Sequence, residues 1–328
     1  MNEAGRIALL RRVLSAETRG GGWRGIEVGI GDDAAVLALS AAGGDHDVGR
    51  RLVWTVDEQV EGTHFRRDLV SWRDIGWRSF MAGASDVAAM GADPWCALSA
   101  LVVPDGVDDA ALEELAQGQQ AATQAVGAPV VGGNLARGPV LSIATTLLGT
   151  CRRAVLRGGA MPGDGLWMAG RVGLAAAGLR ALLTGKAGMA SLETAVLAWR
   201  TPRALVAEGR AMATVAHAAI DVSDGLACDV GHMAQASVVC VVLDEEALLA
   251  DADLASAAGA LGASALDLAL HGGEDYALVA ASPVAIEGFR RIGEITLGRG
   301  LMLRGPSGQR PIEPRGFDHF TSGKPPGA

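Results

Sequence analysis

The sequence predicts an α/β (α+β) protein of two domains, in which acidic residues gather where strands end. Three observations support this prediction. Short β-branched runs alternate with segments of helical period along the chain. The 328 residues exceed the usual size of one domain, about 100–200 residues. Residues 152–165 form a connector rich in Gly, Pro and Arg, so we place the domains at 1–150 and 151–328.

In the first domain, a short N-terminal helix precedes elements in the order β, β, α, β, α, β, β. The expected helices cover residues 7–14, 72–90 and 108–126, and the expected strands cover residues 36–39, 53–56, 96–103, 129–138 and 140–148. We expect the strand at 129–138 to end in a Gly-Gly-Asn turn. Asp108 is a good N-cap for the last helix.

The helix at 72–90 is expected to have two different faces. Trp77 and Phe80 share an apolar face, whereas Gly83 and Asp86 fall on a small, polar and acidic side. Asp57 should lie at the end of the preceding strand. A strand end and a helix that both carry acids can close on a bound group between them, although helix caps and a solvated face would explain the same pattern.

The second domain alternates in the same way. We expect strands at 166–169, 238–243 and 277–281, and a further strand that ends before Asp221. We expect helices at 174–183, 202–215, 247–261 and 265–270, and a further helix that contains Val230 and Met233. Residues 310–320 read as a loop punctuated by proline. This half is therefore an α/β domain that again carries acids at a strand-to-helix corner.

The composition excludes several classes of protein. A net charge of −9 argues against nucleic acid or an anionic membrane as partner. Lys186 and Lys324 are the only lysines, so a catalytic lysine has almost no candidate. The four cysteines are widely spaced and suit a reducing compartment. With no signal peptide and no membrane-spanning run, we expect a cytoplasmic protein.

The acids themselves indicate metal chemistry. They are Asp32, Asp33, Asp57, Asp86, Asp221, Asp224, Glu274 and Asp275. Carboxylates without clustered Cys or His favour Mg²⁺, Mn²⁺ or Ca²⁺ over zinc. A glycosidase would need only one carboxylate pair, whereas many acids beside glycine-rich turns fit several Mg²⁺ ions on a polyphosphate. For each acid alone, a helix cap or an Asx turn is the competing interpretation.

Such a site suits phosphoryl transfer, which depends on positioning and charge neutralisation. A phosphate monoester has a second pKa of about 6 and is mostly deprotonated at pH 7, so as acceptor it needs no general base. We therefore expect no catalytic side chain in the sense of an acid or base. This agrees with a chain that is almost empty of lysine.

In this order, the motifs resemble the thiamine-monophosphate kinase family, within the superfamily of aminoimidazole ribonucleotide synthetase, selenophosphate synthetase and a hydrogenase maturation factor. The motifs that carry the resemblance are Gly29-Ile-Gly-Asp-Asp33, Thr55-Val-Asp57, Glu61-Gly-Thr-His64-Phe65, Ser85-Asp-Val-Ala-Ala-Met-Gly-Ala-Asp-Pro94, Gly132-Gly-Asn134, Arg157, Asp221-Val-Ser-Asp-Gly225, Gly272-Gly-Glu-Asp-Tyr276 and Gly316-Phe-Asp-His-Phe320. They extend over most of the chain.

The resemblance implies direct transfer of the ATP γ-phosphate to thiamine monophosphate, giving thiamine diphosphate and ADP. It also implies a homodimer in which the N-terminal sheets pair. The implied Mg²⁺ ligands are Asp33, Thr55, Asp57, Asp86, Asn134, Asp221 and Asp224. The implied ATP contacts are Gly133, Arg157 and Ser223, and the implied contacts to thiamine monophosphate are His64, Glu274 and Phe317.

The chain departs from the family pattern in three places. Asn134 stands where the family has Asp, Val56 replaces a hydroxyl residue, and Gln124 and Ala125 occupy the segment where an adenine-contacting Tyr is expected. An amide oxygen still coordinates Mg²⁺, but with less charge. The alternatives are a catalytically weak homologue that binds nucleotide or thiamine phosphate, and another ATP-dependent member of the superfamily. The reactive Cys and N-terminal Lys of selenophosphate synthetases and the C-terminal Cys of the maturation factor are not found here.

Overall fold

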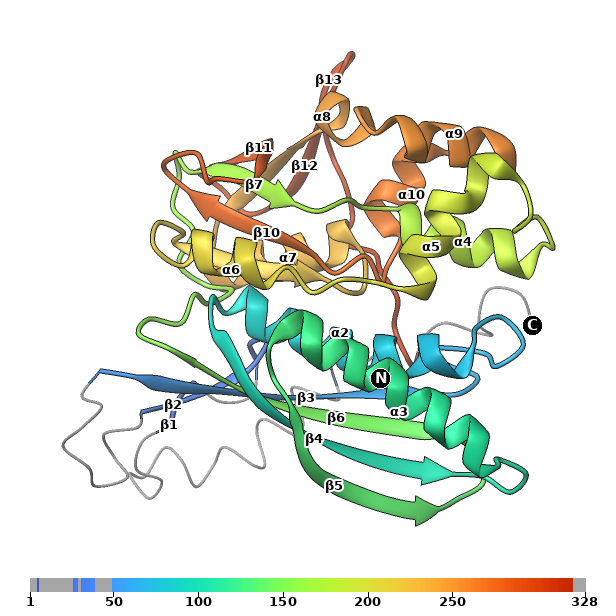
Figure 1. The fold of residues 1–328 in the computed structure, drawn as a ribbon. Coiled ribbons are helices and arrows are strands. Elements are labelled where there is room, and N and C mark those ends of the chain that lie inside the picture. Colours follow the sequence, from blue (N-terminus) through green and yellow to red (C-terminus); the bar gives the residue numbers. More distant parts are fainter. Residues whose placement is uncertain (1–4, 6–25, 29–30, 39–48, 321–328) are drawn as a thin grey trace.

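The computed structural model describes residue 5 and residues 26–28, 31–38 and 49–320, and these build two β-sheets with helices between and around them (Figure 1). The predicted α/β class is confirmed. The helix expected at 7–14 lies outside the described residues. The domain boundary at residue 150 stays a prediction, although the first sheet ends at Cys151 and the second begins at Gly165.

The first half is a mixed sheet of six strands. In spatial order they are β1 (Ile26–Val28), β2 (Ala35–Ala38), β3 (Arg51–Val60), β6 (Ser142–Cys151), β4 (Asp93–Val103) and β5 (Val130–Arg137). Neighbouring strands are antiparallel, except that β4 and β5 are parallel. Two helices, α2 (Trp72–Ala89) and α3 (Asp109–Val126), cover the face of this sheet that looks toward the second half (Figure 1).

Local sequence signals fix the ends of these two helices. The Ser71 side chain accepts a hydrogen bond from the Asp74 N–H, and the Asp74 carboxylate accepts one from the Ser71 N–H, which is a capping box. Asp108 caps α3 as predicted, by accepting from the Ala111 N–H. Gly127 ends α3 with φ of 81°, a conformation that favours glycine.

The second half is a mostly antiparallel sheet of seven strands with helices on both sides. In spatial order the strands are β13 (Gly308–Pro311), β12 (Gly300–Gly305), β9 (Cys240–Asp244), β11 (Arg290–Thr296), β7 (Gly165–Ala169), β10 (Ala277–Ser282) and β8 (Ala218–Val222). The helices are α4 (Leu174–Leu183), η3 (Ala190–Leu192), α5 (Glu193–Arg200), α6 (Val206–Met212), α7 (Leu226–Ser237), α8 (Glu245–Leu249), α9 (Ala252–Leu261) and α10 (Ala265–His271). Only β9 and β12 pair in parallel.

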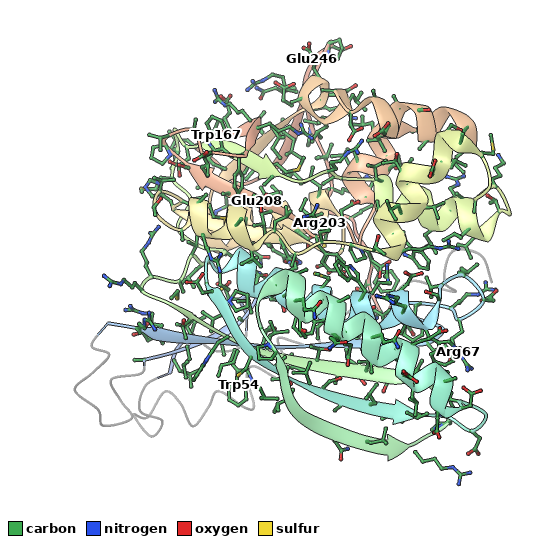
Figure 2. The ribbon with its side chains drawn as sticks, in the orientation of Figure 1. Trp54, Arg67, Trp167, Arg203, Glu208 and Glu246 are labelled. Atoms are coloured by element: carbon green, nitrogen blue, oxygen red, sulfur yellow. The ribbon has the colours of Figure 1, made fainter. Side chains whose placement is uncertain are left out.

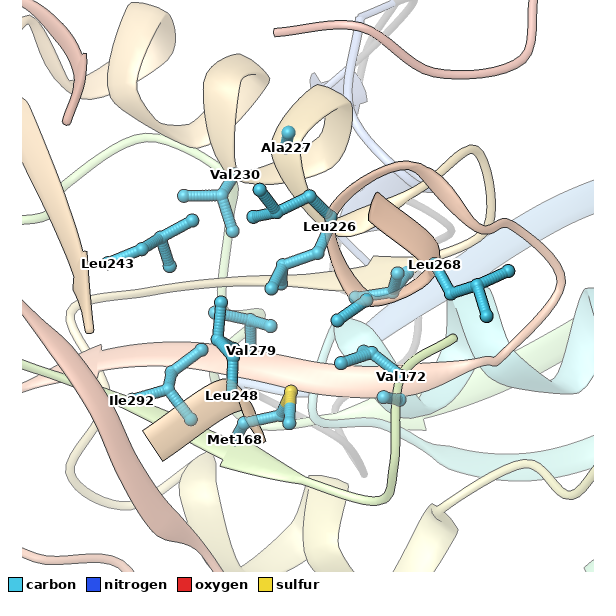
Figure 3. Packing of buried hydrophobic residues seen from close by; sticks show 14 of the residues in the cluster. Met168, Val172, Leu226, Ala227, Val230, Leu243, Leu248, Leu268, Val279 and Ile292 are labelled. Carbon is cyan, nitrogen blue, oxygen red and sulfur yellow. The ribbon is translucent and has the colours of Figure 1, made fainter. Parts of the chain in front are cut away.

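Two large hydrophobic clusters hold these elements. The first lies within the second half, where side chains such as Met168, Val230 and Val279 pack together (Figure 3). The second cluster crosses between the halves. It joins α2 residues such as Phe80 and Met81 to Met212 and Leu278 of the second half. The two halves therefore share part of their core.

Helix α2 is packed on three sides, and side chains fill the space around it (Figure 2). Toward α3, a Cβ added to Gly76 would lie 2.0 Å from the Leu115 carbonyl oxygen. Toward the sheet, a Cβ added to Gly83 would lie 3.5 Å from a β6 side chain. Toward the second half, Met81 Sδ accepts from the Ala204 N–H at 3.4 Å. The polar side of α2 is thus buried, not solvated.

Several elements differ from their sequence prediction. Strand β3 continues to Val60, so Asp57 lies within the strand instead of at its end. The Gly-Gly-Asn segment lies inside β5 and does not form a turn. The single helix expected at 247–261 is divided into α8 and α9, because Asp251 caps a new helix. Helix α5 and strands β11, β12 and β13 were not predicted.

Membrane-spanning helices were sought in the described part of the chain. No single helix there is long and apolar enough to cross a membrane. Helices α9 and α10 pass the test of length and composition only when taken together, and they are bent by 110° relative to each other.

The α2–α3 contact gives a test of the fold. A Cβ on Gly118 would lie 2.0 Å from the Arg73 carbonyl oxygen, so Gly118→Ala should lower the free energy of unfolding by about 1–3 kcal/mol through overpacking. Gly259, in α9, has no atom within 4 Å of an added Cβ. Gly259→Ala should therefore raise stability by about 0.5–1 kcal/mol. Urea unfolding measures both, and equal effects would contradict the close approach of the helices.

Candidate active site

Four carboxylates from separate segments gather beside α2, of which Asp33 and Asp221 are buried and Asp57 and Asp86 are half-buried. Asp33 lies between β1 and β2, Asp57 on β3, Asp86 on α2 and Asp221 on β8. We call these four residues the acid group. They come from both halves of the molecule, and the sequence analysis predicted all four. The shared core between the halves is what brings Asp221 to the other three.

Hydrogen bonds hold the members of the acid group in place. Thr55 Oγ1 donates to Asp86 Oδ2 at 2.5 Å, and Ser85 Oγ donates to Asp221 Oδ2 at 2.6 Å. Arg157 Nε donates to Asp33 Oδ1 at 2.7 Å. Thr55, which was predicted as a metal ligand, therefore lies beside the acids. Arg157 contacts the acid group through Asp33. Ser85 was part of a recognised motif but had no predicted role.

The electrostatics of the acid group favour a cation. Burial raises the pKa of Asp33 to about 7 and that of Asp57 to about 6, and the charge of Asp221 adds to both shifts. Burial and the neighbouring acids also raise the pKa of Asp86 well above its usual value. Among the described residues, Asp33 Oδ2 is buried and has no hydrogen-bond partner. Hard carboxylate oxygens in this condition suit Mg²⁺.

The ligand oxygens of the acid group do not meet at one point. Within the described residues, only one group of three Cys, His, Asp or Glu side chains has its ligand atoms within 4.8 Å of one another, and it lies on α7. The oxygens of the acid group are therefore spaced more widely than a single ion requires. A polyphosphate with its ions fits such an arrangement better than one isolated ion does.

The corner between β8 and α7 is fixed by Asp229, which the sequence analysis missed. Its Oδ2 accepts from the N–H groups of Ser223, Asp224 and Gly225 at 3.0, 3.1 and 3.1 Å. Gly225 has φ of 123°, which only glycine adopts readily. An acid four residues after a Ser-Asp-Gly corner, in the first turn of a helix, is the signal that could have found it.

A pocket of about 1840 Å³ lies next to the acid group. The residues predicted to bind substrate line it, namely His64, Glu274 and Phe317, as do Asp57, Ser223 and Asp224. Aromatic rings meet on one side, where the His319 ring lies 5.0 Å from His64 and 4.8 Å from Phe317. Burial lowers the pKa of His64 to about 4, so this imidazole is neutral at pH 7. The pocket is therefore continuous with the acids through Asp57.

Glu274 is held by two residues that the sequence analysis did not single out. Arg78 Nη2 donates to Glu274 Oε1 at 2.6 Å, and Trp199 Nε1 donates to Oε2 at 2.6 Å. The Arg78 guanidinium also lies over the Trp199 ring, 4.6 Å from its centroid. An arginine between the apolar residues Trp77 and Phe80 of α2 was the available signal, because buried Arg is rare unless paired.

Two of the strand-end acids serve the backbone. Asp275 accepts from the N–H groups of Gly173 and Ala175 at 2.6 and 3.0 Å, at the start of α4. Asp32 accepts from the N–H groups of Asp33 and Arg157. For these two, the cap or turn interpretation describes the contacts.

Gly133 and Asn134 are not brought to the acid group within one chain. They lie on the edge strand β5, and β6 and β4 separate it from β3. The register aligns Asn134 with Ala100 of β4, Ala144 of β6 and Glu58 of β3. Because side chains alternate along a strand, Asn134 is on the opposite face of the sheet from Asp57.

Comparison with known proteins agrees with this architecture. Residues 31–151 match the family model of the AIR synthase related protein, N-terminal domain. The chain is 30% identical over 325 residues to thiamine-monophosphate kinase of Aquifex aeolicus, covering 98% of both chains. The chain belongs to the thiamine-monophosphate kinase family. A family member of Mycobacterium tuberculosis (strain ATCC 25618 / H37Rv) is 37% identical over 282 residues, or 84% of this chain and 81% of the relative.

Solved structures of the family agree as well. The structure described as AaThiL complexed with AMPPCP and TMP has a TM-score of 0.86 at 29% identity and covers 97% of both chains. A structure of hydrogenase maturation protein HypE in complex with ATP has a TM-score of 0.65 at 18% identity, covers 80% of this chain and 84% of that one, and so shares the fold. The resemblance inferred from the motifs is therefore confirmed.

The Arg78–Glu274 pair gives a test of the site. The Arg78 side chain is 2% exposed, so Arg78→Met leaves Glu274 without its buried partner and should lower the free energy of unfolding by about 3 kcal/mol. The matched control is Arg137→Met. Arg137 pairs with Asp105 at the surface, where the two side chains are 79% and 77% exposed, and its loss should cost about 0–1 kcal/mol. Chemical denaturation that gives the two variants the same stability would contradict the buried pair.

Proposed function

We propose that this protein is an ATP-dependent kinase that transfers the γ-phosphate of ATP directly to thiamine monophosphate, giving thiamine diphosphate and ADP in the presence of Mg²⁺. Near full-length relatives bear the name of this activity. The family structure with TM-score 0.86 was solved with AMPPCP, an ATP analogue, and TMP. These findings support both substrates.

The position of Asp57 is the observation that carries the proposal. This residue lines the 1840 Å³ pocket, and it also belongs to the acid group. A substrate held in the pocket can therefore present its phosphate to the ions that the acids attract. An isolated acid group or an isolated pocket would not support transfer between two phosphate-bearing molecules.

Each set of residues then has a role. We assign the Mg²⁺ ions to Asp33, Thr55, Asp57, Asp86, Asp221 and Asp224, with Asn134 as a further ligand. Bound there, the ions neutralise the charge of two anions that must approach each other. We assign ATP contacts to Gly133, Arg157 and Ser223. Glu274 and His64 orient the thiamine part, and Phe317 stacks on one of its rings.

We also propose a cytoplasmic location. All four cysteines lie in the described part of the chain and no disulfide joins them, which suits a reducing compartment.

A product assay tests the activity. The wild-type protein with ATP, Mg²⁺ and thiamine monophosphate should form thiamine diphosphate and ADP in equal amounts, as measured by chromatography. Asp86→Asn keeps an acceptor for Thr55 but removes a charge from the acid group, so kcat should fall by about 100-fold or more. Asp105→Asn, at the exposed pair with Arg137, should leave kcat unchanged.

Stability separates this role from a structural one. Because the acids repel one another without Mg²⁺, Asp86→Asn should not lower the free energy of unfolding of the metal-free protein. Equal losses of activity and stability would contradict a metal role. If the wild type forms no product and Asn134→Asp restores it, the protein is instead the catalytically weak homologue, because the carboxylate returns the charge that Asn134 lacks.

We propose a homodimer that pairs through the six-stranded sheets. Large apolar side chains are exposed on strands β3 and β4, where Trp54, Val56 and Leu98 lie on the face opposite Asp57. The register places Val56 and Leu98 in one row, since both pair with Thr146 of β6. A contiguous apolar face of this kind is typical of an interface. In such a dimer, Gly133 and Asn134 would reach the acid group of the second copy.

Mixed dimers test this arrangement. If Asn134 serves the second copy, Asp86→Asn and Asn134→Ala chains, each inactive alone, should form mixed dimers with one intact site. Random pairing of equal amounts then restores about a quarter of the wild-type rate, since half of the dimers are mixed and each has one working site. No recovery on mixing would place Asn134 in its own chain's site or outside any site.

A further inference from the structure

Three side chains with metal-binding atoms lie together on α7, and none of them lines the pocket. They are Cys228, Asp229 and His232, and their ligand atoms all lie within 4.8 Å of one another. Cys228 Sγ is 3.6 Å from His232 Nε2. Residues four apart on a helix share one face, so the first two turns of α7 present the thiol and the imidazole side by side.

This face of α7 points away from the hydrophobic cluster. Ala227 and Val230 of the same helix belong to the cluster (Figure 3). Cys228 and His232 are half-buried, so a small ion can reach them, whereas Asp229 is buried. The three residues therefore lie at the border between the core and the surface.

The spacing fits a tetrahedral zinc ion. With Zn–S of about 2.3 Å, Zn–N of about 2.05 Å and a tetrahedral angle, sulfur and nitrogen are separated by about 3.6 Å. This is the distance between the Cys228 and His232 atoms. A thiol donating a hydrogen bond to imidazole would give a similar distance, so the third side chain decides between the two.

Asp229 supplies the third ligand atom. Its hydrogen bonds to the N–H groups of Ser223, Asp224 and Gly225 all use Oδ2, which leaves Oδ1 for a cation. Thiolate and imidazole together select zinc over magnesium.

We propose that Cys228, Asp229 and His232 form a binding site for Zn²⁺ or a divalent cation of the same chemistry, separate from the Mg²⁺ ions of the acid group. Three protein ligands leave the fourth position for water, as in open zinc sites.

The site is placed to act on the pocket. Asp229 fixes the backbone of Ser223 and Asp224, which line the pocket. The segment of residues 312–320 crosses the same face of α7. A Cβ added to Gly316 would lie 2.5 Å from Cys228 Cβ. The N–H of the following residue, Phe317, donates to the Asp224 carbonyl oxygen at 3.0 Å. An ion that draws Asp229 and Cys228 together therefore moves the Asp224 backbone, to which the Phe317 N–H is hydrogen-bonded. Occupancy should weaken substrate binding.

Cobalt spectroscopy tests the site without any need for activity. The reduced full-length protein is titrated with Co²⁺ in excess Mg²⁺, which occupies carboxylate sites. We expect a thiolate-to-cobalt charge-transfer band that saturates at one Co²⁺ per chain and is displaced by Zn²⁺. Cys228→Ser should abolish the band, and His232→Asn should weaken Co²⁺ binding at least tenfold.

Cys240→Ser is the matched control, since Cys240 is buried on β9, and it should keep the full band. Circular dichroism confirms that each variant is folded. Absence of the band from the wild type, or a band that persists in folded Cys228→Ser, would overturn the proposal.

A kinetic measurement tests the link to the pocket and rests on the proposed function. Zn²⁺ should raise KM for thiamine monophosphate several-fold in the wild type and leave Cys228→Ser unaffected, with both proteins equal in its absence. If the cobalt band forms but KM does not change, the link to the pocket is wrong while the site stands. If no thiamine diphosphate forms at all, only the proposed function fails.

Discussion

Repulsion between clustered carboxylates is the constraint on which this structure depends. Like charges interact strongly where little water reaches them, and the acid group holds four carboxylates together, two buried and two half-buried. The four acids come from four different segments of the chain. Thr55, Ser85 and Arg157 each donate a hydrogen bond to one of them. Without cations this arrangement costs stability, which is the physical reason for proposing that the acid group binds them.

Helix α2 makes the arrangement possible. It carries Asp86 and Ser85, and its glycines let α3 and the sheet approach closely. Because the helix is packed on three sides, its acid is held rigidly between the two halves. Arg78 on the same helix orients Glu274 in the pocket. One element thus connects the acids, the pocket and the core that both halves share.

Much of this could be predicted from the sequence, because the signals are local. Asp108 marks the start of its helix, and the acids of the acid group lie in motifs that are recognisable in the sequence. What each acid does is decided by residues far away in the chain. Asp275 has the same local context as a metal ligand, yet it accepts hydrogen bonds from backbone N–H groups 102 and 100 residues earlier. Asp229 looks like an ordinary helix residue, and its role depends on the turn that precedes it.

The role of Asn134 could not be read from sequence for a related reason. A Gly-Gly-Asn segment suggests a turn, but pairing with β4 keeps it in an edge strand. Resemblance to a family assigns a role to a residue without saying which copy of the chain benefits from it. Strand order and register add that, within one chain, Asn134 is separated from Asp57 by two strands and lies on the other side of the sheet.

The hydrophobic cluster that spans both halves has a consequence for how molecules enter and leave. A clam-shell motion would expose Phe80, Met212 and Leu278, which are fully buried, and each large side chain would cost about 1.5–3 kcal/mol. For these three side chains alone the sum is about 4.5–9 kcal/mol, which is comparable to the whole stability of a typical protein. Molecules must instead enter and leave the 1840 Å³ pocket through small displacements of residues that line it, such as Phe317 and its neighbours.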